Sequence, residues 1–119
     1  MVAVIKRKIS VILADDHPVV RDGLAAMVNQ QPDMEVVAEA GDGDEAIALY
    51  EQHHPDVMVL DLRMPKRDGV AVVQRVLEVH PKACLLIMTT YDGDEDIFQC
   101  LSQGAKGYRS ILFRWSFQR

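Results

Sequence analysis

Short apolar runs alternate with amphipathic stretches along this 119-residue chain. The apolar runs cover residues 9–14, 35–40, 57–60 and 83–88. Runs of this length, rich in Val, Ile and Leu, are typical of strands buried on both faces. Between them, apolar residues recur at helical spacing, and such alternation predicts a doubly wound α/β fold with a parallel sheet and helices on both faces.

The helix boundaries follow from local signals. The first helix is expected to begin at Pro18, with Asp16 or His17 as its cap, and to end before Pro32. Asp44 is expected to open the second helix. The second helix is expected to end at Pro55. A third helix is expected over 69–79, a fourth over 92–104, and a short fifth strand at 106–109.

Three carboxylates follow two of the predicted strands. Asp15 and Asp16 come after the first strand, and Asp61 comes directly after the apolar run Val57–Leu60. In a five-stranded sheet of order 2-1-3-4-5, the first and third strands are neighbours, and ligands bind at their carboxyl ends. A lone Asp at a strand end is usually a cap or a solvated turn residue, but three acids on one edge favour a binding site.

Converging acids need a cation or a raised pKa, because two charges ~4 Å apart repel by about 4 kcal/mol at an effective dielectric near 20. A cluster of oxygen ligands favours Mg²⁺ over Zn²⁺. A nucleophilic carboxylate beside Mg²⁺ predicts phosphoryl transfer to Asp61. Thr89, at the end of the fourth strand, could bond a phosphoryl oxygen or equally cap the following loop.

Composition narrows the class of protein. The net charge of −5 does not favour nucleic-acid binding by this segment. No apolar run approaches the ~18 residues of a membrane span, and no signal peptide is visible, so we expect a cytoplasmic protein without a membrane contact. Cys84 and Cys100 are expected to be buried thiols, and His53, His54 and His80 to interact with helix C-termini.

Several motifs, taken in order, resemble one family. They are Leu13-Ala14-Asp15-Asp16-His17-Pro18, Val20-Arg21-Asp22-Gly23-Leu24, Asp61-Leu62-Arg63-Met64-Pro65 with Asp68-Gly69, Met88-Thr89, and Gly104-Ala105-Lys106-Gly107-Tyr108. Together they resemble the receiver domain of two-component response regulators, and most closely the subfamily that carries a LuxR-type helix-turn-helix output domain. Residues 1–108 are therefore expected to form a receiver domain, and 109–119 an atypical tail.

The resemblance implies roles for individual residues. Asp61 would accept a phosphoryl group from a sensor histidine kinase. Asp16, Asp61 and the backbone carbonyl of Arg63 would bind Mg²⁺, with Asp15 acting through water. Thr89 and Tyr108 would be the switch residues. DNA would be reached only through an output domain that is not in this chain, and weak self-dephosphorylation would be the only catalysis.

The chain departs from the family after Tyr108. Ile111 occupies the position of a family lysine that pairs with the phosphoryl group, and the family's fifth helix is not recognisable. Residues 109–119 carry three arginines and no acid, and Phe113, Trp115 and Phe117 alternate with polar residues as in a strand. We interpret the tail as a frameshift or an appended sequence, and expect self-association through uncovered apolar surface.

Two other functions remain open from the residues alone. A Mg²⁺-dependent phosphohydrolase could use Asp61 as its nucleophile, but such enzymes usually place an acid two residues later, where this chain has Arg63. A flavodoxin-like cofactor binder would need a Ser/Thr/Gly-rich loop after the first strand, where this chain has Asp15 and Asp16.

Overall fold

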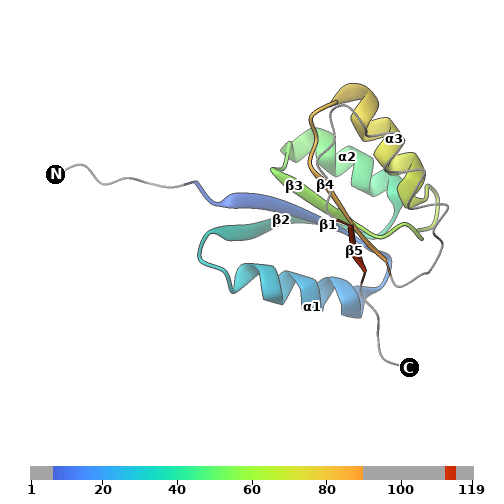
Figure 1. Cartoon of the computed structure of the whole chain (residues 1–119). Coiled ribbons are helices and arrows are strands. Elements are labelled where there is room, and N and C mark those ends of the chain that lie inside the picture. The colour runs from blue at the N-terminus through green and yellow to red at the C-terminus, as the bar shows by residue number, and fades with distance from the viewer. Residues whose placement is uncertain (1–6, 90–111, 115–119) are drawn as a thin grey trace.

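The computed structural model describes residues 7–89 and 112–114, and at 88–89 and 112–114 it describes only the backbone. The elements are β1 (Ile9–Ala14), α1 (Pro18–Asn29), β2 (Met34–Ala40), α2 (Gly43–His53), β3 (Val57–Leu60), α3 (Gly69–Val79), β4 (Leu85–Thr89) and β5 (Leu112–Arg114). Figure 1 shows their arrangement. In the described part of the chain, no helix has the length and apolar character required to cross a membrane.

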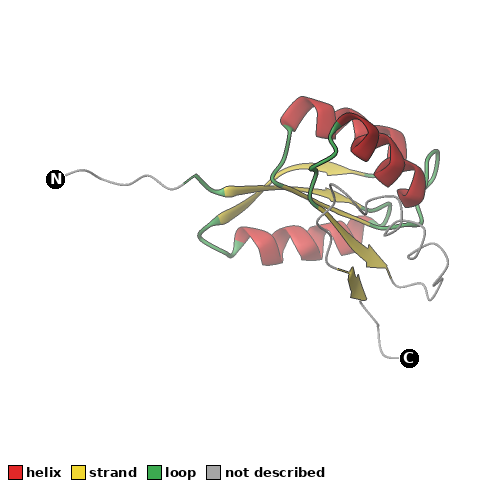
Figure 2. Ribbon diagram, turned by 45° about the horizontal axis from the view of Figure 1, so that its top comes forward, coloured by secondary structure: helices red, strands yellow, loops and turns green. Residues whose placement is uncertain are grey.

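The strands form one parallel sheet of order β2-β1-β3-β4-β5, which confirms the predicted topology. Helix α1 lies on one face, and α2 and α3 lie together on the other (Figures 1 and 2). This is the expected result of right-handed crossovers between parallel strands. It also brings the carboxyl ends of β1 and β3, which are far apart in the sequence, to the same place on the sheet edge.

The fifth strand differs from its predicted position. The predicted segment, 106–109, lies outside the described residues, and β5 is formed by Leu112–Arg114, paired in parallel with Ile87–Thr89. The strand therefore comes from the segment expected to be a separate tail, where the alternating pattern had favoured a strand. The predicted helix over 92–104 also lies outside the described residues, as does any fifth helix.

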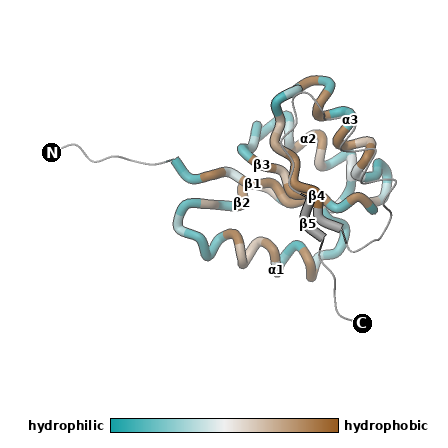
Figure 3. The backbone as a smooth tube through the Cα atoms, viewed as in Figure 1, coloured by the Kyte–Doolittle hydropathy of each residue, from teal (hydrophilic) through white to brown (hydrophobic). Residues whose placement is uncertain are grey.

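The main core lies between the sheet and the pair α2 and α3. Figure 3 shows the hydrophobic strands gathered between the more polar helices. The fully buried side chains of this core include Ile12, Met58, Leu60, Leu85, Ile87, Val72 and Val73. Because strand residues alternate between faces, Val11 and Leu13 lie on the α1 side. The helix described on that side, α1, has no fully buried residue of its own.

The start of α2 corrects one prediction. The helix begins at Gly43, and Asp42, rather than Asp44, is its N-cap. The Asp42 carboxylate accepts a hydrogen bond of 2.8 Å from the Glu45 backbone N–H. Asp44 and Glu45 then occupy the first turn, where negative charge interacts favourably with the helix dipole.

Candidate acidic site

Asp15 and Asp61 lie side by side because of the register between β1 and β3. Ala14 pairs with Leu60, so the two acids are the next residues on neighbouring strands. The Asp61 backbone N–H donates to the Ala14 carbonyl at 2.9 Å, and the Asp15 N–H donates to the Ala40 carbonyl at 3.0 Å. Ligand atoms of Asp15, Asp16, His17 and Asp61 all lie within 4.8 Å of one another. The structure thus brings the three predicted acids together.

The carboxyl group of Asp61 is buried, with only 7% of the residue exposed. Burial is the main cause that raises its pKa, to about 6. A hydrogen bond of 3.1 Å from the Arg63 backbone N–H opposes this rise, while the charges of Asp15 and Asp16 add to it. Near neutral pH, a cation beside Asp61 would therefore favour its ionised form.

His17 is part of the site, although the sequence suggested only a capping role. It is the N-cap residue of α1, but its side chain makes no capping hydrogen bond. Its backbone N–H donates to Asp15 Oδ1 at 2.8 Å, and its ring Nδ1 lies 2.9 Å from the same oxygen. The hydrogen bond to Asp15 is the largest of the causes that raise the pKa of His17. The signal in the sequence was a histidine directly after two acids.

Asp16 provides the observation that tests whether a metal ion fits. Its Oδ1 atom is buried and has no hydrogen-bond partner among the residues that the structure describes. His17 Nδ1 lies 3.1 Å away, but the hydrogen bond of that ring nitrogen goes to Asp15. Buried polar atoms are normally satisfied, so an unpaired carboxylate oxygen beside two further acids suits a bound cation. Oxygen ligands fit a hard ion such as Mg²⁺.

The loop that follows Asp61 is held against the start of α2. The Gly43 N–H donates to the Pro65 carbonyl at 3.3 Å, and a Cβ atom at Gly43 would lie 1.7 Å from the Arg67 carbonyl oxygen. Ion pairs at the same place join Lys66 to Asp42 at 3.5 Å and Arg67 to Asp44 at 2.9 Å. These contacts fix the loop that carries Arg63.

The far end of this loop leads into α3. Asp68 caps the helix by accepting a hydrogen bond of 3.0 Å from the Ala71 N–H, and the Gly69 N–H donates to the Leu62 carbonyl at 2.8 Å. A Cβ atom at Gly69 would lie 2.5 Å from the Cα of Leu62. Both glycines, Gly43 and Gly69, are therefore required by close backbone approach rather than by a special φ angle.

The other predicted site residues are described in part or not at all. Thr89 is the last residue of β4. Leu60, directly before Asp61, pairs with Ile87, which lies two residues before Thr89. The backbone of Thr89 is therefore at the same sheet edge as Asp61. Its side chain is not described, and Tyr108 and Ile111 lie outside the described residues. The Arg63 backbone carbonyl stays a predicted metal ligand.

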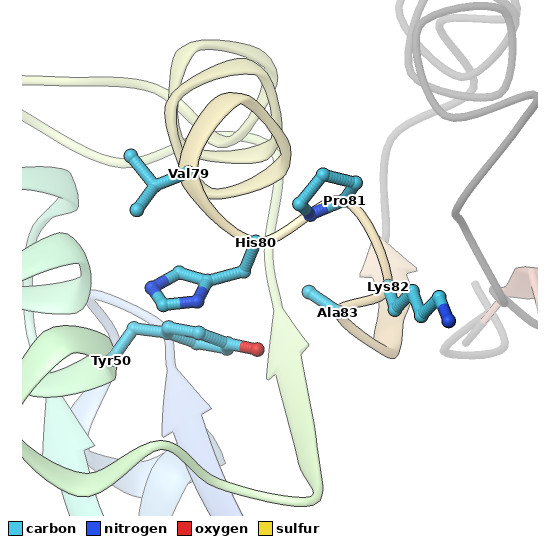
Figure 4. A pocket seen from close by; sticks show the side chains of 6 residues that line it. All are labelled: Tyr50, Val79, His80, Pro81, Lys82 and Ala83. Carbon is cyan, nitrogen blue, oxygen red and sulfur yellow. The ribbon is translucent and has the colours of Figure 1, made fainter.

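A second hollow lies at the ends of α2 and α3, away from the acids. Tyr50, Val79, His80, Pro81, Lys82 and Ala83 line it (Figure 4). The His80 ring lies 5.1 Å from the Tyr50 ring, and its Nε2 is 2.6 Å from Glu51 Oε2. His80 therefore joins α2 to α3, which goes beyond the predicted interaction with a helix end. Cys84, expected to be buried, is half-buried.

Comparison with known proteins gives a consistent family. Residues 11–110 match the family model described as the response regulator receiver domain. The chain is 43% identical over 103 residues to the uncharacterized transcriptional regulatory protein YxjL of Bacillus subtilis, covering 87% of this chain and 47% of that protein. It is 46% identical over 99 residues to the oxygen regulatory protein NreC of Staphylococcus haemolyticus, covering 82% and 46%.

Solved structures agree with this result. The signal receiver domain of the putative response regulator NarL from Mycobacterium tuberculosis is similar, with a TM-score of 0.78 and 36% identity. That match covers 87% of this chain and 84% of that domain. The chain spans about half the length of the curated relatives that it matches.

Proposed function

Because this chain belongs to the family of response regulator receiver domains, we propose that Asp61 is its phosphoacceptor and that Asp15, Asp16 and Asp61 hold the Mg²⁺ required for the reaction. The observation that carries the proposal is the convergence of these carboxylates, with Asp16 Oδ1 buried and without a hydrogen bond from the described residues. Proteins of this family act as phosphoacceptors in two-component signalling rather than as conventional enzymes.

The chemistry assigns separate tasks to the residues. An oxygen of ionised Asp61 attacks the phosphorus of a phosphohistidine, a P–O bond forms, and the P–N bond breaks with its electron pair going to the imidazole. Bound Mg²⁺ would supply positive charge to the transferred phosphoryl oxygens. The Arg63 N–H, 3.1 Å from Asp61 Oδ1, orients the acceptor carboxylate. Only 7% of Asp61 is exposed, which limits the contact of its carboxylate with water.

The readout of phosphorylation is assigned by family resemblance. Thr89 would bond a phosphoryl oxygen, which its place at the end of β4 supports. Tyr108 would follow as the switch aromatic. Ile111 in place of the family lysine should weaken this readout more than it weakens Mg²⁺ binding, because Ile111 carries no charge for the phosphoryl group. Slow self-dephosphorylation is the further expected reaction.

The partners follow from the same family. We propose that a sensor histidine kinase phosphorylates the domain in the cytoplasm. We also propose that DNA is contacted only by an output domain joined to it in a longer protein, since the relatives named as regulators are about twice as long. The phosphohydrolase alternative gains no support, because the position two residues after Asp61 is Arg63 and the matches are response regulators.

Phosphorylation of the purified chain by acetyl phosphate with Mg²⁺ tests the acceptor. We expect wild type to gain the mass of one phosphoryl group, and Asp61→Asn to gain none. Asp33→Asn, an exposed acid outside the site, is the matched control and should be labelled like wild type. Labelling of Asp61→Asn at the wild-type rate would overturn the assignment. The assignment would also fail if Asp33→Asn lost its labelling while Asp61→Asn kept it.

Self-association is proposed separately. Strand β5 is at the end of the described sheet order, and edge strands with apolar residues can pair with another chain. Light scattering at increasing concentration should show a rising mass. Phe113→Pro should reduce it, because proline removes a backbone donor from the edge. A constant monomer mass would contradict the proposal without affecting the acceptor assignment.

A further inference from the structure

Arg21 links three parts of the chain behind the acidic site. It lies in the second turn of α1, where its backbone N–H donates to the His17 carbonyl at 3.0 Å. Its Nη1 donates to the Asp15 backbone carbonyl at 2.6 Å, and its Nε donates to Glu39 Oε1 on β2 at 3.3 Å. The side chain is only 21% exposed. Arg21 thus spans from α1 to the carboxyl ends of β1 and β2.

The carbonyl that Arg21 holds belongs to the peptide between Asp15 and Asp16. A peptide unit is planar, so fixing its carbonyl also fixes the direction of the Asp16 N–H and the course of the chain into Asp16. The other groups of Asp15 are already held: its N–H bonds the Ala40 carbonyl, and its Oδ1 accepts from the His17 N–H. Arg21 completes the set of contacts that orient Asp15.

Asp16 has fewer constraints of its own. Its buried Oδ1 accepts no hydrogen bond from the described part of the chain, and His17 Nδ1, which lies 3.1 Å from it, bonds Asp15 instead. The position of this carboxylate therefore depends on the backbone before it. The Asp15–Asp16 peptide is the part of that backbone which Arg21 contacts.

We propose that Arg21 is a positioning residue for the acidic site, and that it fixes the Asp15–Asp16 peptide so that both carboxylates face one divalent cation. This inference rests on the proposed Mg²⁺ site. It concerns a residue that would touch neither the cation nor the phosphoryl group.

Charge and positioning make opposite predictions for Arg21. If only charge mattered, removing a guanidinium that contacts the Asp15 carbonyl would strengthen the binding of a divalent cation, because one repulsive interaction disappears. If Arg21 positions the peptide, its removal would weaken binding, because Asp16 would no longer be held in place. The nearby Glu39 carboxylate, 3.3 Å from Arg21 Nε, balances part of the arginine charge and so reduces the purely electrostatic effect.

Titration with MgCl₂, followed by backbone amide chemical shifts in NMR, separates these possibilities. We expect Arg21→Met to weaken Mg²⁺ binding roughly 10-fold, as is typical when a residue that orients metal ligands is removed. Arg21→Lys should lose less affinity than Arg21→Met. Its ammonium can donate to the Asp15 carbonyl, but it cannot also bond Glu39 as the planar guanidinium does. The amide spectrum reports in the same samples whether each variant is folded.

Two controls complete the experiment. Arg75→Met removes an exposed arginine on α3 and should leave Mg²⁺ affinity within about twofold of wild type, as expected for a solvent-screened charge. Glu39→Gln should also have a small effect, since it leaves the contact to Asp15 intact. Unchanged or stronger Mg²⁺ binding by Arg21→Met would overturn the inference. Wild type failing to bind Mg²⁺ would overturn the proposed metal site itself.

Discussion

The Arg63 backbone N–H donates a hydrogen bond of 3.1 Å to Asp61 Oδ1, and this bond is not enough to keep the acid easily ionised. Burial, together with the charges of Asp15 and Asp16, outweighs it and raises the pKa of Asp61 to about 6. The proposed acceptor is therefore a group that the folded chain holds in an unfavourable charged state at neutral pH. This has a direct consequence for stability.

Asp61→Asn should stabilise the protein at pH 7.5 in the presence of EDTA. Because the folded-state pKa is raised, the favourable contribution of Asp61 is present below its ordinary pKa and is lost as pH rises through about 6. The substitution removes this penalty, and urea unfolding should show a gain of at most about 3 kcal/mol. The gain should shrink towards pH 4, and an equal gain at both pH values would show that the raised pKa of Asp61 is not its source.

Mg²⁺ should stabilise wild type more than a variant that lacks the Asp16 carboxylate. A cation that binds only the folded chain raises its stability by mass action. We expect the melting temperature of wild type to rise with MgCl₂ concentration, while that of Asp16→Ala stays nearly constant because the unpaired Oδ1 is gone. NaCl at matched ionic strength is the control for screening. Equal rises for both proteins would argue against Asp16 as a ligand.

Two glycine substitutions should change the stability of the fold in opposite directions. Gly43→Ala should destabilise the chain by about 2–3 kcal/mol, because its Cβ would collide with the Arg67 backbone carbonyl and displace the loop after Asp61. Gly23→Ala, in α1, should stabilise it by about 0.5–1 kcal/mol, because the new Cβ would meet no atom within 4 Å beyond its own turn of helix. Thermal unfolding of both variants provides the comparison, and a stable Gly43→Ala would show that the loop can move away.

The glycines illustrate what sequence reasoning could predict. Gly43 and Gly69 stand at or beside predicted helix starts, but the sequence could not predict that two distant backbones approach each other there. The strands ending at Ala14 and Leu60 were predictable because buried parallel strands are short, apolar and bounded by proline or acids. Their register follows, and with it the convergence of Asp15 and Asp61.

Asp56 should provide stability that is lost in strong acid. Its carboxylate accepts hydrogen bonds from Arg7 at 2.8 and 2.9 Å and from the Ser10 N–H at 2.8 Å, and these bonds, the Arg7 contacts first, lower its pKa to about 2. A lowered pKa stabilises the fold above about pH 4, and that contribution disappears as pH falls towards 2. Asp56→Asn should therefore cost about 1–2 kcal/mol at pH 7 and less at pH 3.

Urea unfolding at both pH values checks this, with Asp33→Asn as a control for a general effect of removing an acid. If the loss caused by Asp56→Asn is the same at pH 7 and pH 3, the pair with Arg7 and Ser10 is not its source. This cluster lies at the opposite end of β1 and β3 from Asp61, so the variant should leave phosphorylation unchanged.

Some of the site could not be predicted, for physical reasons. The role of His17 depends on its ring turning towards Asp15 instead of capping α1, and this choice between two local partners is decided by the folded geometry. The contact between Arg21 and the Asp15 carbonyl joins a helix surface to a strand end, and spacing along the chain carries no signal for it. The helix start at Gly43 was missed because Asp42 and Asp44 are equally good caps by composition.

Helix α1 packs on the sheet without a single fully buried residue, although Val11 and Leu13 beneath it are buried. Thin packing of this kind makes α1 the element expected to open locally, so its amide hydrogens should exchange with solvent faster than those of β1 and β3. The residues at its start, His17 and Arg21, hold Asp15. Opening of α1 would therefore remove the His17 and Arg21 contacts to Asp15, and a cation bound by the acids should slow amide exchange along α1.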